Sequence, residues 1–381
     1  MIELQTFLDQ ALQRHSLPGA VAMIGNRQGV IASAASGLSD PCTNRAMSLD
    51  NIFQIASMTK IVTSVAAMQL VERDLLSLDE PIDEILPELA NPNVIAGIDE
   101  DGRVQLKPAQ SAITLKHLLT HTSGLGYAFT SAEMANAQGE VAAASIASIT
   151  SPLVFEPGTD WLYGVSTDWV GRAVEMVSGQ SLGSYMDEHI LGPLAMHDTG
   201  FAVAPHDEGR RVALLSRTSD GFEPFPLEIG GGEAAEFHSG GGGLYSTAAD
   251  YMRFMRMLLN QGMGEGAQIV GEDSVALMSR NQVGSIRAGA FQSTVPLLSE
   301  DFDSFPGMKT DWGLGFLINQ NAGPHGRAPG SLSWAGLANC YFWIDPVNDV
   351  AGLVLMQFLP FADRAALDLL NGLESAVYHS A

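Results

Sequence analysis

The sequence has very little cysteine and little positive charge. Cys42 and Cys340 are the only cysteines in 381 residues, which excludes a disulfide framework and a four-cysteine zinc site and leaves two free thiols as the expectation. Acidic residues outnumber basic ones by 43 to 19, and the formal net charge of −24 is spread along the chain. A surface of this sign repels nucleic acid and anionic lipid, so we expect neither as a partner.

The sequence also lacks the long apolar runs that cross membranes. No uninterrupted hydrophobic stretch reaches about 20 residues, the length of a membrane-spanning helix. The N-terminal stretch MIELQTFLDQALQRHS carries acidic residues early and has no basic segment followed by an apolar core. It therefore predicts an amphipathic helix rather than a signal peptide, and we expect a cytoplasmic protein that does not insert into membranes.

The order of the expected elements predicts an α/β fold with an inserted helical part. Residues 19–37 contain two runs of small and β-branched residues around the turn NRQG, which indicates an antiparallel hairpin. Helical periodicity dominates the middle of the chain, and strand-like runs return near its end. We predict an antiparallel sheet domain from residues 1–50 and 310–381, flanked by the terminal helices, and a mostly helical domain from residues 51–309. A site between the two would suit an enzyme.

Ser57 and Lys60 form a Ser-x-x-Lys pattern at the start of an apolar helical run. Only four lysines occur in the chain, and burying an ammonium is unfavourable unless it is paired or gives up its proton. On a helix the two side chains share a face, and the helix N-terminus favours negative charge at Ser57 while it disfavours the ammonium form of Lys60. The pattern thus predicts an activated serine nucleophile beside an uncharged amine. The alternative is an N-capping serine with a lysine that reaches outward to solvent.

Two further segments, WLYGVSTDW and SWAGLANCYFWIDP, contain candidate partners for this pair. Tyr163 precedes an expected helix and lies on a loop, from which its phenol could relay protons for a Ser-Lys pair. Trp334, Ala335 and Gly336 lie in an expected strand, where the glycine permits close approach of a ligand to the strand edge. Both segments have an ordinary alternative, because such aromatic residues and strands are common in protein cores.

Motifs of several other enzyme classes are absent or incomplete. His117 and His121 have the spacing of a helical metal pair, but without an HExxH pattern the interpretation is a structural role. The glycine run 240–243 lacks the remaining residues of a dinucleotide or phosphate loop and is predicted to be a tight, exposed loop. No G-x-S-x-G motif occurs, which leaves Ser57 as the leading nucleophile. We expect no metal and no cofactor.

In combination these motifs resemble the serine β-lactamase and penicillin-binding protein superfamily. The resemblance is strongest to the class C-like branch and, within it, to the family VIII carboxylesterases. It implies a β-lactamase-like α/β fold, with an antiparallel sheet flanked by the terminal helices and a helical domain whose edge carries the serine. The similarity runs in one order over nearly the whole chain and is carried by Ser57-Met-Thr-Lys60, LLTHTSGL at 118–125, Tyr163-Gly-Val165, the segment 239–259 and Trp334-Ala335-Gly336.

The resemblance also implies roles for individual residues. Ser57 would be the acylated nucleophile, with Lys60 and Tyr163 as the pair that transfers protons. The backbone N–H groups of Ser57 and Leu337 would form an oxyanion hole, in which each donor lowers the barrier by about 3 kcal/mol.

Pocket residues depart from the pattern of true β-lactamases. Tyr127 and Asp168 match positions that line or brace the pocket in the esterase branch. Val165 stands where a β-lactamase has an asparagine, so an amide that would bind a lactam substituent is missing. Trp334 stands where a lysine would receive the carboxylate of a β-lactam, and it offers an apolar wall and one N–H donor instead. An unpaired carboxylate is poorly bound in such a pocket, so the predicted substrate is a neutral ester.

The predicted function is that of a serine carboxylesterase, which hydrolyses small, short-chain acyl esters through an acyl-enzyme on Ser57. The alternatives are an amidase, D-aminopeptidase or weak β-lactamase of the same superfamily, and a non-catalytic binding or scaffold protein. A scaffold would be expected to lose Ser57, Lys60 or Tyr163, and all three are present. Either Lys60 or Tyr163 could be the general base, and the oligomeric state is left open. Residues 97–112 and 285–308 are expected to shape the acyl and alcohol pockets.

Overall fold

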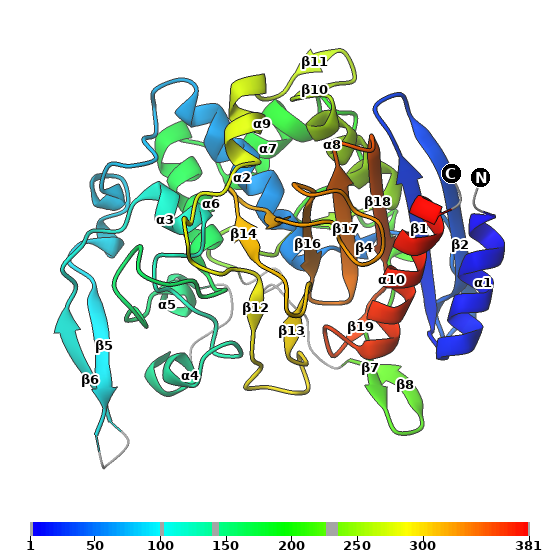
Figure 1. Ribbon diagram of the computed structural model, residues 1–381, viewed down its shortest axis with the longest axis horizontal. Coiled ribbons are helices and arrows are strands. Elements are labelled where there is room, and N and C mark those ends of the chain that lie inside the picture. The colour runs from blue at the N-terminus through cyan, green and yellow to red at the C-terminus, as the bar shows by residue number, and fades with distance from the viewer. Residues whose placement is uncertain (1–2, 100–102, 139–144, 226–234, 380–381) are drawn as a thin grey trace.

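The main sheet is built from the two ends of the chain, and most helices come from the segment between them (Figure 1). The computed structural model describes residues 3–99, 103–138, 145–225 and 235–379. Short 3₁₀ turns lie at Ala56–Met58, Ile82–Glu84, Pro87–Leu89 and Glu208–Arg210, and a π-helical turn lies at Asp187–Leu191. The α-helices are α1 (Leu4–His15), α2 (Thr59–Val71), α3 (Leu115–Leu119), α4 (Ala132–Gln138), α5 (Ile146–Ile149), α6 (Ser166–Ser178), α7 (Leu182–Met186), α8 (Ala248–Leu259), α9 (Glu272–Met278) and α10 (Arg364–His379).

Smaller groups of paired strands surround the main sheet. The main sheet contains β1 (Gly19–Gly25), β2 (Val30–Asp40), β3 (Arg45–Ala46), β14 (Thr310–Trp312), β15 (Leu317–Asn319), β16 (Leu332–Gly336), β17 (Cys340–Asp345) and β18 (Val350–Leu355). The smaller groups are β4 (Phe53–Gln54) with β9 (Tyr245–Ser246), β5 (Asn93–Ile98) with β6 (Val104–Pro108), β10 (Met263–Gly264) with β11 (Ala267–Gln268), β12 (Ala290–Phe291) with β13 (Phe302–Asp303), and β7 (Leu215–Thr218) with β8 (Gly221–Pro224) and β19 (Phe358–Leu359).

The order of strands in the main sheet is β14-β15-β16-β17-β18-β1-β2-β3. Strand β1 pairs antiparallel with β18, in the register Val21 opposite Leu355, and antiparallel with β2 on its other side. Every residue of β1 is buried, because the strand is central and both of its faces are covered. The N-terminal hairpin and the C-terminal strands therefore share one sheet, and the predicted β-lactamase-like architecture is confirmed.

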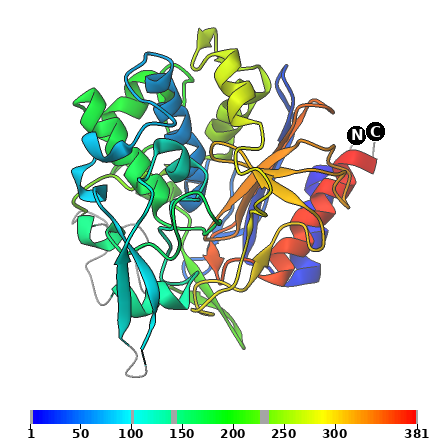
Figure 2. The same cartoon turned by 60° about the vertical axis from the view of Figure 1, so that its left-hand side comes forward.

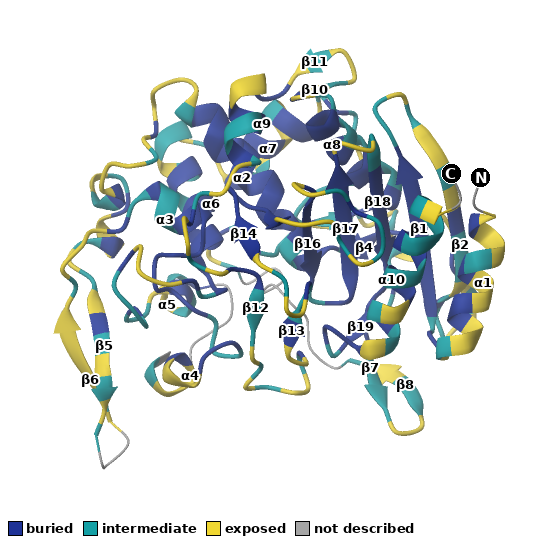
Figure 3. Cartoon of the chain, in the orientation of Figure 1, coloured by how far each residue is buried: buried dark blue, intermediate teal, exposed yellow. Residues whose placement is uncertain are grey.

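The main sheet lies between two layers of helices (Figure 2). Helices α1 and α10 pack on each other and cover one face, while α8 and the remaining helical part lie on the other face (Figure 2). Leu4, Leu8 and Leu12 recur every four residues in α1 and are buried, which is the apolar stripe predicted from the sequence. Strands β16 to β18 are buried through almost their whole length (Figure 3).

Some local predictions differ from the structure. The helical pattern expected in the middle of the chain is interrupted after α3, where the backbone becomes irregular and His121 has a φ of 57°. The segment 331–346 forms two strands, β16 and β17, separated by a turn. The boundaries proposed for a sheet domain and a helical domain stay a prediction. No helix in the described ranges has the length and apolar character needed to cross a membrane.

A buried ion pair holds α10 to the loop before β16. Arg327 Nε donates to Glu374 Oε2 at 2.7 Å, and both side chains are almost fully buried. The Arg327 guanidinium also lies over the Trp343 ring of β17, 5.3 Å from its centroid. Loss of one charge would leave the other uncompensated in a low-dielectric environment.

We expect Glu374→Gln to lower the free energy of unfolding by about 3 to 5 kcal/mol, because it leaves the Arg327 charge buried without a partner. Chemical denaturation of both proteins measures the difference. Glu208→Gln is the matched control, since the Arg211–Glu208 pair is 42% and 50% exposed and exposed pairs contribute about 1 kcal/mol or less. Equal effects of the two substitutions would contradict this account of the buried pair.

Candidate active site

A cavity of about 310 Å³ lies beside Ser57. The residues singled out from the sequence meet there: apart from Lys60, every predicted site residue lines the cavity, namely Ser57, Tyr127, Tyr163, Val165, Asp168, Trp334, Ala335, Gly336 and Leu337. These residues come from segments that are far apart in the chain. The fold therefore gathers the sequence-predicted residues into one place.

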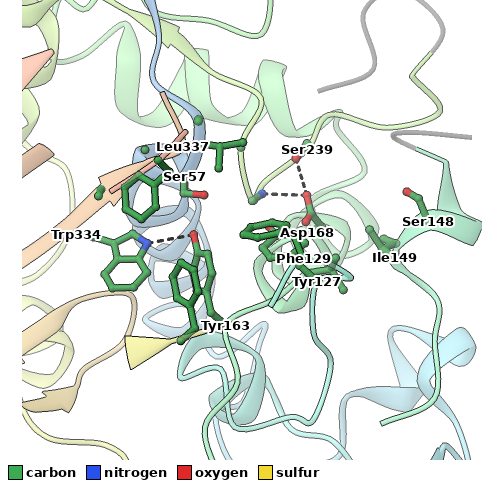
Figure 4. Close-up of a pocket in the computed structure, with 18 of the residues that line it drawn as sticks. Ser57, Tyr127, Phe129, Ser148, Ile149, Tyr163, Asp168, Ser239, Trp334 and Leu337 are labelled. Atoms are coloured by element: carbon green, nitrogen blue, oxygen red, sulfur yellow. Dashed lines mark hydrogen bonds between the residues drawn. The ribbon is translucent and has the colours of Figure 1, made fainter. Parts of the chain in front are cut away.

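Ser57 lies in the 3₁₀ turn Ala56–Met58, which leads directly into α2. Ala56 has a φ of 44°, a left-handed conformation that costs an alanine free energy and therefore needs support from its surroundings. Support comes from the end of β16, where a Cβ on Gly336 would lie 2.2 Å from the Ile55 carbonyl oxygen. Because only glycine permits this approach, Leu337 lies next to Ser57 at the cavity wall (Figure 4).

Lys60 is 1% exposed and lies one helical turn behind Ser57. Its Nζ donates three hydrogen bonds, to Ser57 Oγ at 3.2 Å, to Tyr127 Oη at 3.0 Å and to the Gly241 carbonyl oxygen at 2.7 Å. An ammonium group has three N–H donors and no acceptor, so these three oxygens match its charged form.

The charge of Lys60 corrects one prediction made from the sequence. Burial acts to lower the pKa of Lys60, but the oxygens of Tyr127 and Tyr163 and the Asp168 carboxyl group outweigh it and raise that pKa above its ordinary value of 10.5. The predicted uncharged amine is therefore wrong. Helix position and burial were visible in the sequence, whereas the oxygens that surround the amine come from three distant segments.

Tyr163 lies on the loop before α6, and its side chain is 4% exposed. Its Oη accepts a hydrogen bond from Trp334 Nε1 at 3.1 Å, and the hydroxyl points toward Ser57 (Figure 4). Lys60 Nζ lies 4.7 Å from the centroid of the Tyr163 ring. The Lys60 ammonium and the Trp334 N–H thus both lie beside the side chain of Tyr163.

The glycine run 240–243 is not exposed as predicted, because Gly240 and Gly241 are buried and Gly242 and Gly243 are half-buried. Asp168 Oδ1 accepts hydrogen bonds from Ser239 Oγ at 2.6 Å and from the Gly241 N–H at 3.0 Å. Thr63 Oγ1 of α2 donates to the Gly240 carbonyl oxygen at 2.8 Å. The loop is thereby wedged between α2 and α6, and it supplies the carbonyl that binds Lys60. Composition alone suggested a surface turn because nothing in the run reveals these partners.

The two histidines near α3 have separate structural surroundings. His117 Nδ1 accepts from the backbone N–H of Thr114, which completes the cap of α3. His121 packs against the rings of Tyr163 and Trp312, and burial together with the charge of Lys60 holds its pKa well below the usual range. In the described part of the chain, no group of three potential metal ligands comes together.

Aromatic and aliphatic walls of the cavity were missed in the sequence. The walls include Phe129, Phe237, Phe291, Phe361 and Ile149. Phe291 comes from the predicted pocket segment 285–308, but no described residue of 97–112 lines the cavity, because that segment forms the β5–β6 hairpin that projects outward (Figure 1). Single phenylalanines in loops carry no periodic signal, so only the fold identifies them.

Comparison with known families places this geometry in context. The family model described as Beta-lactamase matches residues 4–376, nearly the full length of the chain. The chain belongs to the beta-lactamase family. The predicted serine β-lactamase superfamily relationship is confirmed by this match, and members of the family similar to this chain include acyltransferases and esterases.

Individual relatives of this beta-lactamase-family chain are similar over almost their whole length. The chain is 30% identical to the monacolin J acid methylbutanoyltransferase of Aspergillus terreus, covering 99% of this chain and 95% of that protein. It is 31% identical to the lovastatin esterase of Penicillium rubens, covering 98% of each. Among solved structures, a mutant of simvastatin synthase from Aspergillus terreus superposes with a TM-score of 0.83 at 28% identity, covering 98% of this chain and 96% of that one.

Gly241→Ala should lower the free energy of unfolding by about 1 to 3 kcal/mol, because its Cβ would lie 2.5 Å from Asp168 Oδ2 and force the packed loop apart. Gly242→Ala is the matched control, since the nearest atom to its Cβ is 3.8 Å away, and we expect a change within about 0.5 kcal/mol. Thermal and denaturant unfolding measure both. A loop that tolerated both alanines equally would not be wedged as described.

Proposed function

We propose that this protein hydrolyses small, neutral carboxylic esters through an acyl-enzyme on Ser57, in the manner of the family VIII carboxylesterases. The observation that carries the proposal is the arrangement of Ser57 Oγ, the Lys60 ammonium and the Tyr163 hydroxyl at one end of a largely apolar cavity. No lysine, arginine or histidine of the described residues lines that cavity to receive a carboxylate. A neutral acyl ester is therefore the substrate class that the cavity suits best.

Tyr163 is the general base in this proposal. Lys60 has its three N–H donors engaged and a raised pKa, so it has no lone pair with which to take the proton of Ser57. In this proposal Tyr163 acts as the phenolate, with the Lys60 ammonium beside its ring and the Trp334 N–H bound to its Oη. The hydroxyl of Ser57 transfers its proton to Tyr163 Oη as Ser57 Oγ attacks the acyl carbon.

The remaining steps follow from the same groups. The backbone N–H groups of Ser57 and Leu337 bind the oxyanion, and Tyr163 returns the proton to the leaving alcohol as the C–O bond breaks. Water then attacks the acyl-enzyme while Tyr163 takes its proton, and Tyr163 passes that proton to Ser57 Oγ as the acyl C–O bond breaks and the carboxylic acid leaves. Each step moves one proton between Ser57, Tyr163 and the substrate, and Lys60 stays charged throughout.

Cavity size and lining support a compact substrate. Walls formed by Phe129, Phe291 and Phe361 provide apolar contact for a small acyl or alcohol group, and the cavity of about 310 Å³ limits its size. The described lining has no cationic side chain to bind the carboxylate of a β-lactam, which disfavours β-lactams as substrates. Small amides would fit the cavity as well as small esters do. The short-chain preference and the cytoplasmic location stay predictions.

Acyl transfer to an alcohol is the second candidate activity. The relatives similar to this chain over almost its full length include both a methylbutanoyltransferase and an esterase. An apolar cavity favours an organic alcohol over water as the group that attacks the acyl-enzyme, because the alcohol buries apolar surface there. The ratio of new ester to free acid, measured with an added alcohol, separates transfer from hydrolysis.

An aryl phosphonate should add one adduct to the intact protein, visible by mass spectrometry, and Ser57→Ala should abolish it. The same substitution should reduce hydrolysis of a nitrophenyl ester by at least about 10³-fold, because it removes the oxygen that is proposed to attack the acyl carbon. A chromogenic cephalosporin, measured in parallel, should be turned over far more slowly than the ester. An adduct that survives Ser57→Ala, or comparable rates on both substrates, would overturn the proposal.

Trp334→Phe should lower kcat/KM by about 10-fold to 100-fold, because a hydrogen bond to a charged group contributes about 1.5 to 3 kcal/mol. The substitution keeps an aromatic ring at the wall but removes the N–H that binds Tyr163 Oη. Trp312→Phe is the control, since it removes the N–H that binds the Leu119 carbonyl and does not touch the cavity. Its kcat/KM should change less than about 3-fold even where its stability falls. Equal losses in the two variants would remove Trp334 from the mechanism.

A further inference from the structure

Lys60 carries a buried positive charge without a direct carboxylate partner. Within the described residues, no acidic oxygen lies within ion-pair distance of its Nζ. Its three acceptors, Ser57, Tyr127 and Gly241, are hydroxyl or carbonyl groups that are neutral in their ordinary forms. A buried ammonium is stable only where a negative charge or a strong dipole compensates it, so the compensation for Lys60 has to come from beyond this shell.

Asp168 is the only acidic residue that lines the cavity in the described part of the chain, and it is 4% exposed. It reaches Lys60 through one residue of the glycine loop. Its Oδ1 accepts from the Gly241 N–H at 3.0 Å, and the Gly241 carbonyl accepts from Lys60 Nζ at 2.7 Å. Hydrogen bonds in series polarise one another, so a negative charge on Asp168 strengthens the carbonyl as an acceptor for the ammonium.

We propose that Asp168 is the counter-ion of Lys60, acting across Gly241, and that it is a positioning residue which keeps Lys60 charged during ester hydrolysis. This inference rests on the proposed function for its consequence in catalysis. Asp168 does not contact the reacting atoms. It sets the charge of Lys60, which lies beside Tyr163, the proposed general base.

Apart from Tyr163, the general base of the proposed mechanism, the groups that face Lys60 leave Asp168 as the one source of negative charge in their ordinary protonation states. Tyr127 and His121 face it from the segment after α3, Tyr163 from the loop before α6, and Asp168 from α6 itself. Burial raises the pKa of Tyr127, which keeps its phenol neutral, and His121 is also neutral. Burial acts on Asp168 in the same direction and raises its pKa, while Lys60 and the donors Ser239 and Gly241 oppose that increase. The pair is therefore mutually stabilising.

The alternative account is that Asp168 only braces the backbone of the glycine loop, a role that does not need its negative charge. Ser239 Oγ already donates to the same Oδ1, and Thr63 and Thr59 of α2 bind the Gly240 carbonyl and the Leu244 N–H. A neutral side chain with one acceptor oxygen at position 168 would still bind the Gly241 N–H and hold the loop in place. The negative charge is needed only if it acts on Lys60.

Asp168→Asn tests the charge, because it keeps an oxygen acceptor for Gly241 and Ser239. In the proposed mechanism, ester hydrolysis needs Lys60 as the charged ammonium. The kcat/KM of the wild type therefore falls as the pH rises through the pKa of Lys60, which lies above the ordinary lysine value of 10.5. In Asp168→Asn the fall should move down by about one pH unit or more, into the range that can be measured. Ser239→Ala, which removes one hydrogen bond but keeps the charge, should leave the position of the fall unchanged.

Two outcomes separate the inference from its alternative. A purely structural role would lower kcat/KM of Asp168→Asn by the same factor at every pH, and that result would overturn the proposal. Asp345→Asn, at a buried carboxylate on β17 outside the cavity, controls for the loss of any buried charge and should not move the fall. Asp168→Ser, which also keeps an acceptor, replaces Asp168→Asn if the latter does not fold.

Unfolding free energy gives a readout that does not need catalysis. The stability that Asp168 confers on the charged form of Lys60 is present at neutral pH and is lost once Lys60 deprotonates in the folded protein. The stability gap between the wild type and Asp168→Asn should therefore stay constant up to the ordinary lysine value of 10.5 and narrow only above it, whereas a structural brace would leave the gap constant at every pH. If the wild type neither hydrolyses esters nor reacts with a phosphonate, the proposed function is wrong. The pH dependence of the stability difference between the wild type and Asp168→Asn would still show whether Asp168 is the counter-ion of Lys60.

Discussion

The active-site arrangement depends on one buried ammonium group and the three oxygens that it binds. Lys60 joins Ser57 on its own helix, Tyr127 from the segment after α3 and Gly241 from the glycine loop. Because an ammonium cannot remain in an apolar interior without acceptors, these segments have to meet for the core around α2 to form. The same group that brings charge to the cavity therefore also ties together the elements that surround it.

The main sheet supplies the opposite wall by a different kind of interaction. The end of β16 comes against the turn that holds Ser57, and the contact is backbone against backbone at Gly336 and Ile55. Strand β16 pairs with its sequence neighbours β15 and β17, and the long-range pairing of β1 with β18 joins these strands to the N-terminal hairpin. A charged network on one side and a rigid strand on the other give the cavity its fixed geometry.

The sequence predicted the architecture and most of the polar residues of the cavity, but it did not predict the charge of Lys60. Ser57, Lys60, Tyr163 and Trp334 were identifiable because their motifs occur in one order, and the hairpin and the C-terminal strands followed from alternating and β-branched patterns. The charge of Lys60 was predicted wrongly, because it depends on carbonyl and phenol oxygens brought in from other segments. The burial of the glycine loop and the aromatic walls were likewise missed, since tertiary packing alone determines them.

The aromatic walls also have a consequence for how this chain can be altered. Phe129 follows α3, Phe291 belongs to β12 and Phe361 follows β19, so three separate segments shape the space for the substrate. Their rings contact one another, with centroids 6.2 Å apart for Phe129 and Phe291 and 6.3 Å apart for Phe291 and Phe361. Phe129 also stacks on Tyr127 and Phe291 on Tyr163, whereas the ring contacts of Phe361 are to Phe291, Phe302 and Tyr341. Preference for one acyl group over another can therefore diverge among descendants of this fold most freely at Phe361, where a change leaves the bond-breaking apparatus intact.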